Sequence, residues 1–436
     1  MQYRQNRALV IWAFAVFVYL AAVFHRTSLG VASLAASERF GLGPAALGMF
    51  TVLQIGVYAA MQVPTGLLVD RYGARRVLTV AALLMGTGQL IFAFATSYPL
   101  GLLARAVLGV GDAMTFVSVL RLVAAHFPAR RYAAVASFTA ALGALGNFAS
   151  TLPLSMLLGS AGWTTTFAVA GAVTALYSVV LVLRVRDNPA GVVPEPVEAQ
   201  SLRTVCAQVS AAWRTPGTRL GFWVHFSTMF APAMLGLLWG FPYLVQAQGL
   251  SEPVAGLVLG ILVVGAVVGG PAIGTVISRH PEWRTPMVVG YLLAAIGTWA
   301  VLLGWPAGQV PLPVLIAGFA VLSLGGPSST IAFALARDYN PLRRVGTATG
   351  VVNVGGFVAI TVSALAVGLL LDLAGTADPG TAFRLAFLSV VAVLLLGLWR
   401  TSVWWRRARA AVFDAAERGE DVPVQIRRRA WDLAPA

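Results

Sequence analysis

Apolar runs of roughly 20 residues recur along the whole chain, and no other feature constrains its fold as strongly. Of the 436 residues, 58% are hydrophobic and only 11% are charged, whereas a soluble domain carries about a quarter charged residues. Each run is long enough to cross the ~30 Å hydrocarbon core of a bilayer as a helix. Runs this long and this uniformly apolar do not fit barrel strands. The sequence therefore predicts an all-α membrane protein.

The spacing of the apolar runs predicts twelve transmembrane helices. We expect them at 8–36, 45–69, 76–95, 98–127, 132–159, 162–184, 218–246, 252–278, 285–304, 311–337, 344–371 and 381–404. The domains are then an N-terminal six-helix bundle, a cytoplasmic linker, a C-terminal six-helix bundle and a cytoplasmic tail, at 1–185, 186–217, 218–404 and 405–436. In the linker we expect a surface helix near 200–214, and in the tail a short interfacial helix.

Arginines gather in alternate predicted loops. The segments 71–76, 128–131 and 341–344 carry clustered arginines, whereas 96–99 and 305–310 carry no charge. Basic loops stay on the cytoplasmic side of a membrane. We therefore expect both termini in the cytoplasm and an even number of spans.

The two halves of the chain repeat each other. Gly66-x-x-x-Asp70-Arg71 has a counterpart in Gly274-x-x-x-Ser278-Arg279, and Pro-x-Arg-Arg occurs at 128–131 and again at 341–344. The separations of the two pairs are nearly equal, as two six-helix pseudo-repeats would give. Such repeats place a binding cavity between the halves, near the bilayer midplane, and open it by rocking.

The basic turn after the second run resembles the loop after the second helix of the major facilitator superfamily (MFS). Gly73 permits a tight turn, Gly66 permits close helix approach, and the arginines can reach helix ends or acids. We expect a conformational latch here, and the alternative is that the charges only set topology. The latch residues are Gly66, Asp70, Arg71, Gly73, Arg75 and Arg76.

The fourth run carries the pattern Arg105-x-x-x-Gly109-x-Gly111-Asp112, which resembles the fourth helix of the same superfamily. An arginine inside a membrane costs at least ~2.5 kcal/mol on insertion scales, so it needs water or a partner. Asp112 is one of very few acids deep in any run. We expect Asp112, with Arg105, to carry proton coupling; the alternative is a static counter-ion for an arginine.

The first run carries Tyr19 and, seven residues later, Arg26. This pair is similar to that of the phosphate-ester antiporters of the superfamily, in which a second cation from helix seven completes the anion site. Helix seven here offers His225, which is only partly charged at pH 7, so a monoanion or a carboxylate fits better than a phosphate dianion. The alternatives are that Arg26 pairs with Asp112 and that His225 only packs.

Asn147 and Asn353 are further polar residues within runs, and we assign them to solute contact. The fifth run lacks the Gly-Pro-x-x-Gly-Gly motif of drug–proton antiporters. We find no phosphate-binding loop, one cysteine, four scattered histidines, and no nucleic-acid module despite a net charge of +14. We therefore expect no enzyme activity, cofactor, bound metal or nucleic-acid partner.

The resemblance extends over essentially the whole chain and is strongest to bacterial organic-anion and sugar-phosphate-permease-like carriers. It implies a monomeric secondary transporter in the bacterial plasma membrane, the cell inner membrane. Such a carrier moves a small polar, anionic organic solute by alternating access, as a proton-coupled symporter. Its partners are then the solute, protons and the lipid bilayer. Two alternatives remain: an efflux pump for amphipathic drugs or metabolites, and a ligand sensor with a transporter fold.

Overall fold

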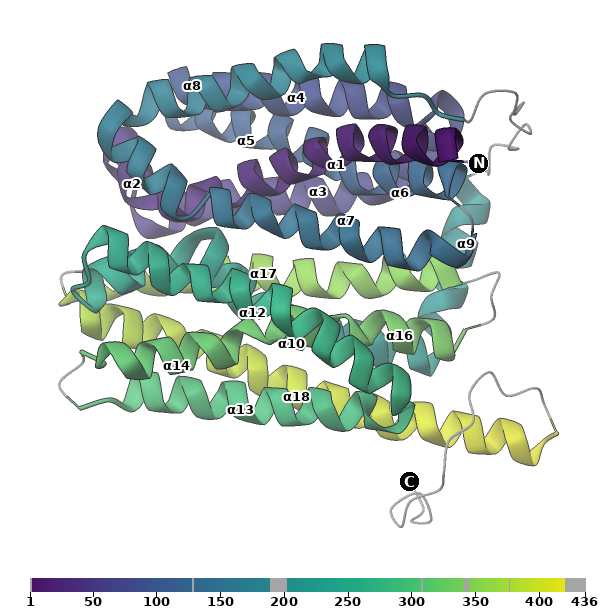
Figure 1. The fold of residues 1–436 in the computed structure, drawn as a ribbon. Helices are drawn as coiled ribbons and strands as arrows, with labels where there is room; N and C mark the ends of the chain where they lie inside the picture. Colours follow the sequence, from purple (N-terminus) through teal and green to yellow (C-terminus); the bar gives the residue numbers. More distant parts are fainter. Residues whose placement is uncertain are drawn as a thin grey trace. The chain divides into compact units, whose positions relative to one another are not determined.

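The computed structural model describes residues 2–127, 129–188, 202–306, 309–340, 345–375 and 377–419. Within these ranges the regular structure is helical and contains no strand (Figure 1). Contacts along the chain divide it into two compact units. The first is Met1–Ala199, Leu235–Val263 and Leu371–Leu373, and the second is Gln200–Met234, Val264–Leu370 and Ala374–Ala436.

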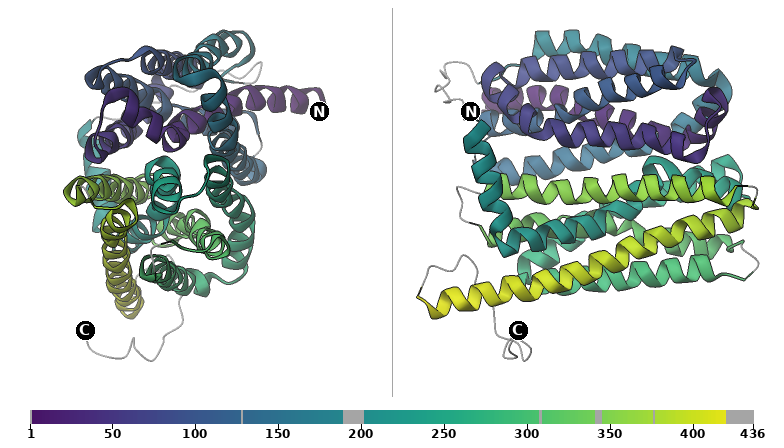
Figure 2. Two further views of the ribbon diagram at one scale, coloured as in Figure 1. Left: turned by 90° about the vertical axis from the view of Figure 1, so that its left-hand side faces the viewer. Right: turned by 180° about the vertical axis from the view of Figure 1, so that it is seen from behind.

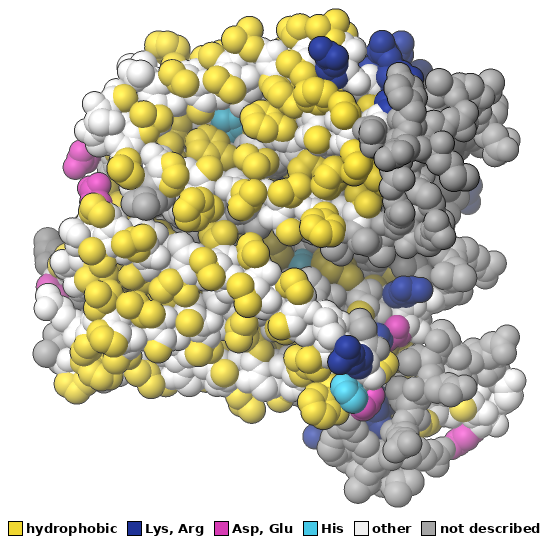
Figure 3. Space-filling model, viewed as in Figure 1, with side chains coloured by type: hydrophobic (Ala, Val, Ile, Leu, Met, Phe, Trp, Pro, Cys, Tyr) yellow, Lys and Arg dark blue, Asp and Glu magenta, His cyan; other side chains and the backbone are white. Residues whose placement is uncertain are grey.

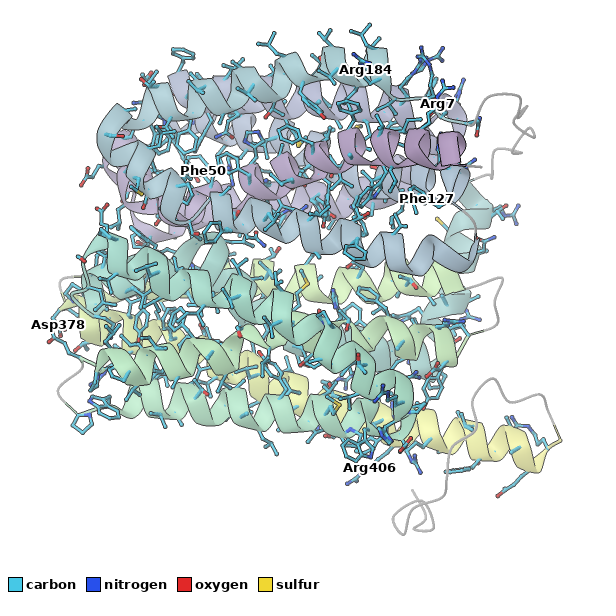
Figure 4. All side chains as sticks on the ribbon, viewed as in Figure 1. Arg7, Phe50, Phe127, Arg184, Asp378 and Arg406 are labelled. Atoms are coloured by element: carbon cyan, nitrogen blue, oxygen red, sulfur yellow. The ribbon has the colours of Figure 1, made fainter. Side chains whose placement is uncertain are left out.

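The first unit contains every helix up to Arg184 and one segment from later in the chain. Its helices are α1 (Gln2–Val31), α2 (Ser33–Phe40), α3 (Pro44–Tyr72), α4 (Ala74–Phe94), α5 (Tyr98–Ala113), α6 (Thr115–His126), α7 (Ala129–Ala149) and α8 (Leu152–Arg184). The later segment adds the π-helical turns η1 (Leu235–Trp239) and η2 (Tyr243–Ala247), α11 (Gly240–Pro242) and the start of α12 (Glu252–Arg279). Figure 4 shows Arg7 and Arg184 at the same end of this unit.

The second unit contains the remaining helices. They are α9 (Leu202–Arg214), α10 (Pro216–Met234), the rest of α12, the 3₁₀ turn η3 (Pro281–Trp283), α13 (Arg284–Gly304), α14 (Leu312–Ser323), α15 (Gly325–Ser329), α16 (Ile331–Asp338), α17 (Val345–Ala374) and α18 (Pro379–Glu417). Within each unit the long helices run roughly alongside one another (Figure 2).

Eleven helical stretches within the described ranges are long and apolar enough to cross a membrane. They correspond to eleven of the twelve predicted spans, and α7 lies in the remaining one. Large apolar side chains point outward, as on α8, where Leu176 is 70% exposed, and Figure 3 shows apolar side chains spread over the helices. The chain is therefore an integral membrane protein whose outer surface suits lipid.

Predicted span ends agree best with the structure at glycine turns. Span five was expected at 132–159 and span six at 162–184, and Gly162 interrupts α8 between them with a φ of 73°. Gly73, with a φ of 82°, likewise separates α3 from α4. Only glycine adopts such φ values without strain.

Several predicted spans are interrupted rather than continuous. Span four is divided into α5 and α6 at Met114, and span ten into α14, α15 and α16. In span seven, α10 passes into π-helical turns around Pro232 and Pro242. Proline lacks the N–H that continues the helical ladder, and apolar periodicity alone does not locate such breaks.

Glycines set the closest helix contacts of the first unit. A methyl group at Gly86 on α4 would lie 2.5 Å from the Ala175 backbone nitrogen and 2.7 Å from the Gly171 carbonyl oxygen on α8. Only a residue without a side chain lets these two backbones approach so closely. The α4–α8 contact therefore depends on Gly86.

The tail differs from the expectation of a separate interfacial helix after 404. The last helix, α18, continues without interruption from Pro379 to Glu417. In the linker, α9 covers Leu202–Arg214, close to the expected surface helix. Residues 189–201 of the linker and 420–436 of the tail lie outside the described ranges.

We predict that Gly86→Ala lowers the melting temperature of the purified protein, because the added methyl group overpacks the α4–α8 contact by about 1–3 kcal/mol. Gly297→Ala on α13 is the matched control, since no atom lies within 4 Å of a methyl group there. Thermal unfolding in detergent measures both. Equal melting temperatures for Gly86→Ala and the parent would contradict the packing argument.

Candidate functional site

The most concentrated charge inside the first unit is a two-pronged ion pair between α1 and α5. Arg26 donates from Nε to Asp112 Oδ2 at 2.8 Å and from its terminal nitrogen to Oδ1 at 2.6 Å. The side chain of Arg26 is 15% exposed and that of Asp112 is fully buried. Both carboxylate oxygens are therefore occupied, and the Arg26 side chain keeps a small exposed fraction.

This geometry answers a question that the sequence left open. The partner of Asp112 is Arg26, whereas Arg105 hydrogen-bonds to the backbone of α1. Arg105 donates to the carbonyl oxygens of His25 and Arg26, at 3.4 and 3.5 Å, and is 1% exposed. Arg105 therefore supports the turn of α1 that carries the ion pair.

Two tyrosines border the ion pair. The guanidinium of Arg26 lies over the ring of Tyr58 on α3, 4.7 Å from its centroid. Tyr19 packs against Phe116 and covers Gly143 on α7, where a methyl group would lie only 2.2 Å from the Tyr19 ring. Three aromatic or charged side chains from α1 and α3 thus gather around one buried carboxylate.

Asn147 on α7 stands apart from this cluster. It is half-buried, and no described hydrogen bond joins its side chain to Arg26 or Asp112. The backbone carbonyl oxygen of Asn147 accepts a hydrogen bond from Ser150 Oγ at 2.8 Å, and Ser150 Oγ lies 2.6 Å from Thr27 Oγ1. Asn147 is therefore linked to α1 through the residue next to Arg26.

In the second unit the structure brings His225 and Asn353 together. His225 on α10 is 2% exposed, and the side chain of Asn353 and the backbone of Ser329 lie near its ring. Neither ring nitrogen has a partner within hydrogen-bond distance. The ring packs against Phe333, with centroids 4.9 Å apart, and against Gly356. Buried polar atoms usually have a hydrogen-bond partner, so a buried imidazole whose two ring nitrogens both lack one is unusual.

Asp187 is a contact residue of the predicted latch that sequence reasoning missed. A Cβ at Gly73 would lie 2.6 Å from an Asp187 carboxylate oxygen, and the Arg75 backbone N–H donates to Asp187 Oδ1 at 2.7 Å. The carboxylate thus caps the N-terminus of α4, where anions are favoured. Its only sequence signal is an acid just beyond the last residue of span six.

Few described contacts involve the other residues of the predicted latch. Arg71 lies over the ring of Tyr72, 5.2 Å from its centroid. A methyl group at Gly66 would meet no atom within 4 Å, so the close helix approach expected there is absent in the described part. The side chains of Arg75 and Arg76 form no ion pair with described residues, and that of Asp70 lies outside the description. The latch role stays a prediction.

We predict that Arg26→Met destabilises the protein more than the double variant Arg26→Met/Asp112→Leu. Removing one partner of a buried ion pair costs about 3–5 kcal/mol because an uncompensated charge remains, whereas replacing both by apolar groups costs far less. Thermal unfolding of parent, single and double variants forms the cycle. If the stability losses of the two single variants simply added up in the double variant, the ion pair would not exist as described.

A family model described as the Major Facilitator Superfamily matches residues 15–303 and, in a second match, 221–433. The "Probable sulfoacetate transporter SauU" of Cupriavidus necator is 27% identical over 382 residues, covering 83% of this chain and 86% of that protein. The "Probable galactarate/D-glucarate transporter GarP" of Escherichia coli is 27% identical over 403 residues, covering 82% and 87%.

The fold has solved counterparts. The bacterial homologue of the human lysosomal transporter Spinster, in an inward-facing and unoccupied conformation, superposes with a TM-score of 0.72 at 16% identity. The match covers 93% of this chain and 97% of that one. It supports the expected layout of twelve membrane helices in two six-helix repeats. The predicted family is confirmed: the chain belongs to the Major Facilitator Superfamily.

Proposed function

We propose that this protein is a secondary transporter of small organic anions that couples their movement to protons as a symporter. The observation that carries the proposal is the Arg26–Asp112 ion pair, in which a fully buried acid binds an arginine whose side chain is 15% exposed. Ionisable residues inside a membrane mark solute paths and proton relays. A buried charge pair of this kind is thus a functional candidate.

The chemistry follows from competition for one guanidinium. The planar fork of arginine binds a carboxylate through two parallel hydrogen bonds, and Asp112 makes both of them here. A proton on Asp112 removes its negative charge and weakens both bonds. The guanidinium of Arg26 is then free to bind a carboxylate of the solute. Proton and anion therefore load together, which is the requirement for symport.

The relatives indicate which anions to test. One is named as a transporter of sulfoacetate and another as a transporter of galactarate and D-glucarate. All three compounds are small, acyclic organic anions that carry at least one carboxylate. A carboxylate fits the Arg26 fork, so these compounds are the first probes for this chain.

His225 and Asn353 extend the proposal to the second unit. The two unpartnered ring nitrogens of His225 and the amide of Asn353 supply hydrogen-bond donors and acceptors without a fixed charge. Such groups suit hydroxyl or carboxylate oxygens of a polar solute better than the aromatic body of a drug. This argues against the amphipathic efflux alternative.

The setting of the proposal is the bacterial plasma membrane, with both termini in the cytoplasm and a monomer working by alternating access. Support comes from the arginine-rich loops, because basic loops remain in the cytoplasm. The loop of Gly66–Arg76, fixed at Asp187, is then a cytoplasmic latch of the first unit. A flux measurement also tests the sensor alternative, since a sensor binds its ligand but shows no transport.

We predict that Asp112→Asn abolishes solute accumulation driven by a pH gradient, because an amide cannot take up and release the proton. Proteoliposomes with labelled sulfoacetate or D-glucarate, acidic outside, give the measurement. Asp378→Asn is the control: Asp378 caps α18, and asparagine caps equally well. Full accumulation by Asp112→Asn would refute the coupling role, and parent-like uptake by Arg26→Ala would refute the anion clamp.

We predict that His225→Leu raises the half-saturation concentration of the transported anion about tenfold or more, because a hydrogen bond to a charged group contributes about 1.5–3 kcal/mol. The maximal rate should change less. His280→Leu serves as the control, since His280 is 52% exposed and pairs with Glu282. Unchanged saturation in His225→Leu would leave that histidine a packing residue.

A further inference from the structure

One indole ring in the second unit is surrounded by three guanidinium groups. The Cζ atoms of Arg219, Arg407 and Arg400 lie 4.8, 4.9 and 5.9 Å from the centroid of the Trp404 ring. Arg219 belongs to α10, and the other two belong to α18. Each cation is attracted to the ring face, but the three like charges repel one another. A bound anion would relieve this repulsion.

Further rings hold these arginines in place. Arg219 also lies 5.3 Å from the ring of Trp213 on α9, and Arg400 lies 5.0 Å from that of Trp223 on α10. Trp404 itself is 5% exposed. The guanidinium positions are therefore set by three helices, so the group is pre-organised in the way a binding site requires.

No acid in the described part of the chain neutralises the group. Arg219, Arg400 and Arg407 form no ion pair among the described residues. Arg219 donates one hydrogen bond, from Nε to the Trp213 carbonyl oxygen at 2.8 Å. Arg400 Nε and Trp404 Nε1 are buried without a partner. Hydrogen-bond donors and positive charge are thus in excess at one place.

The cluster lies at the depth of lipid headgroups. The helix α18 begins behind the exposed cap Asp378, and Arg400 and Trp404 follow ~33 and ~39 Å further along at 1.5 Å per residue. The hydrocarbon core is ~30 Å thick, and the headgroup layers extend a bilayer to ~40–45 Å. With Asp378 at one interface, these residues reach the headgroups of the opposite leaflet. Tryptophan and arginine are typical of this layer.

We propose that Arg219, Arg400 and Arg407, held by Trp404, bind the phosphate of an anionic phospholipid such as phosphatidylglycerol. The guanidinium forks match phosphate oxygens, and the lipid charge relieves the repulsion among the arginines. The bound headgroup joins the start of α10 to α18. This proposal rests on the geometry of the second unit and does not depend on the transport mechanism.

The test measures lipid binding to the purified full chain by native mass spectrometry. Phosphatidylglycerol is expected to bind at least about fivefold more tightly than phosphatidylcholine, since one basic residue near an anionic surface contributes about that factor. Trp404→Leu keeps every charge but removes the ring that the arginines share, and it should abolish the preference. Arg400→Gln and Arg219→Gln should each weaken phosphatidylglycerol binding about fivefold.

Arg406→Gln is the matched control. Arg406 is an exposed neighbour on α18 (Figure 4), and its loss removes the same charge without touching the ring cluster. An equal loss in Arg406→Gln and Arg400→Gln would reduce the effect to general surface charge and overturn the site. Equal binding of the two lipids by the parent would overturn it as well, and so would equally tight binding of soluble glycerol phosphate, which would assign the site to a free anion.

Discussion

A charged side chain inside a bilayer needs water or a partner within the protein, and this requirement organises the first unit. Asp112 is fully buried, and Arg26 occupies both of its oxygens. Arg105 bonds instead to the backbone that carries Arg26. Tyr58 and Tyr19 then enclose the pair. The packing of α1 against α5 thus gives the buried charge of Asp112 its partner. The proposed transport chemistry uses the same ion pair.

Much of the fold was predictable because lipid imposes simple rules. Apolar length located the spans, and the turns at Gly73 and Gly162 fell where the sequence placed loops. Arg26, Asp112 and Arg105 stood out singly, because ionisable residues are rare in such runs. The pairing of Arg26 with Asp112 could be stated only as an alternative to solute contact by Arg26. Arg26 and Asp112 lie 86 residues apart, and only the packing of α1 on α5 decides which arginine reaches the acid.

Other features were missed for equally physical reasons. Asp187 accepts a hydrogen bond from the backbone N–H of Arg75, which lies 112 residues away beside the turn at Gly73. A lone acid after a span does not indicate such a partner. The breaks at Met114 and around Pro232 leave hydropathy unchanged, so the predicted spans ran through them. The ring of Trp404 meets Arg219 only because α10 and α18 pack together, which the sequence pattern does not encode. Local rules predict elements, whereas contacts between distant elements require the packed structure.

The unbroken length of α18 has a mechanical consequence. At ~1.5 Å per residue its 39 residues form a rod of ~58 Å, nearly twice the ~30 Å hydrocarbon thickness. Unlike the interrupted spans, it has no joint at which a tilt can be absorbed. A small rotation of the helix would therefore displace its exposed end, at Asp414, the most. A spectroscopic label near the exposed end of α18 would therefore report tilting of the helix within the bundle.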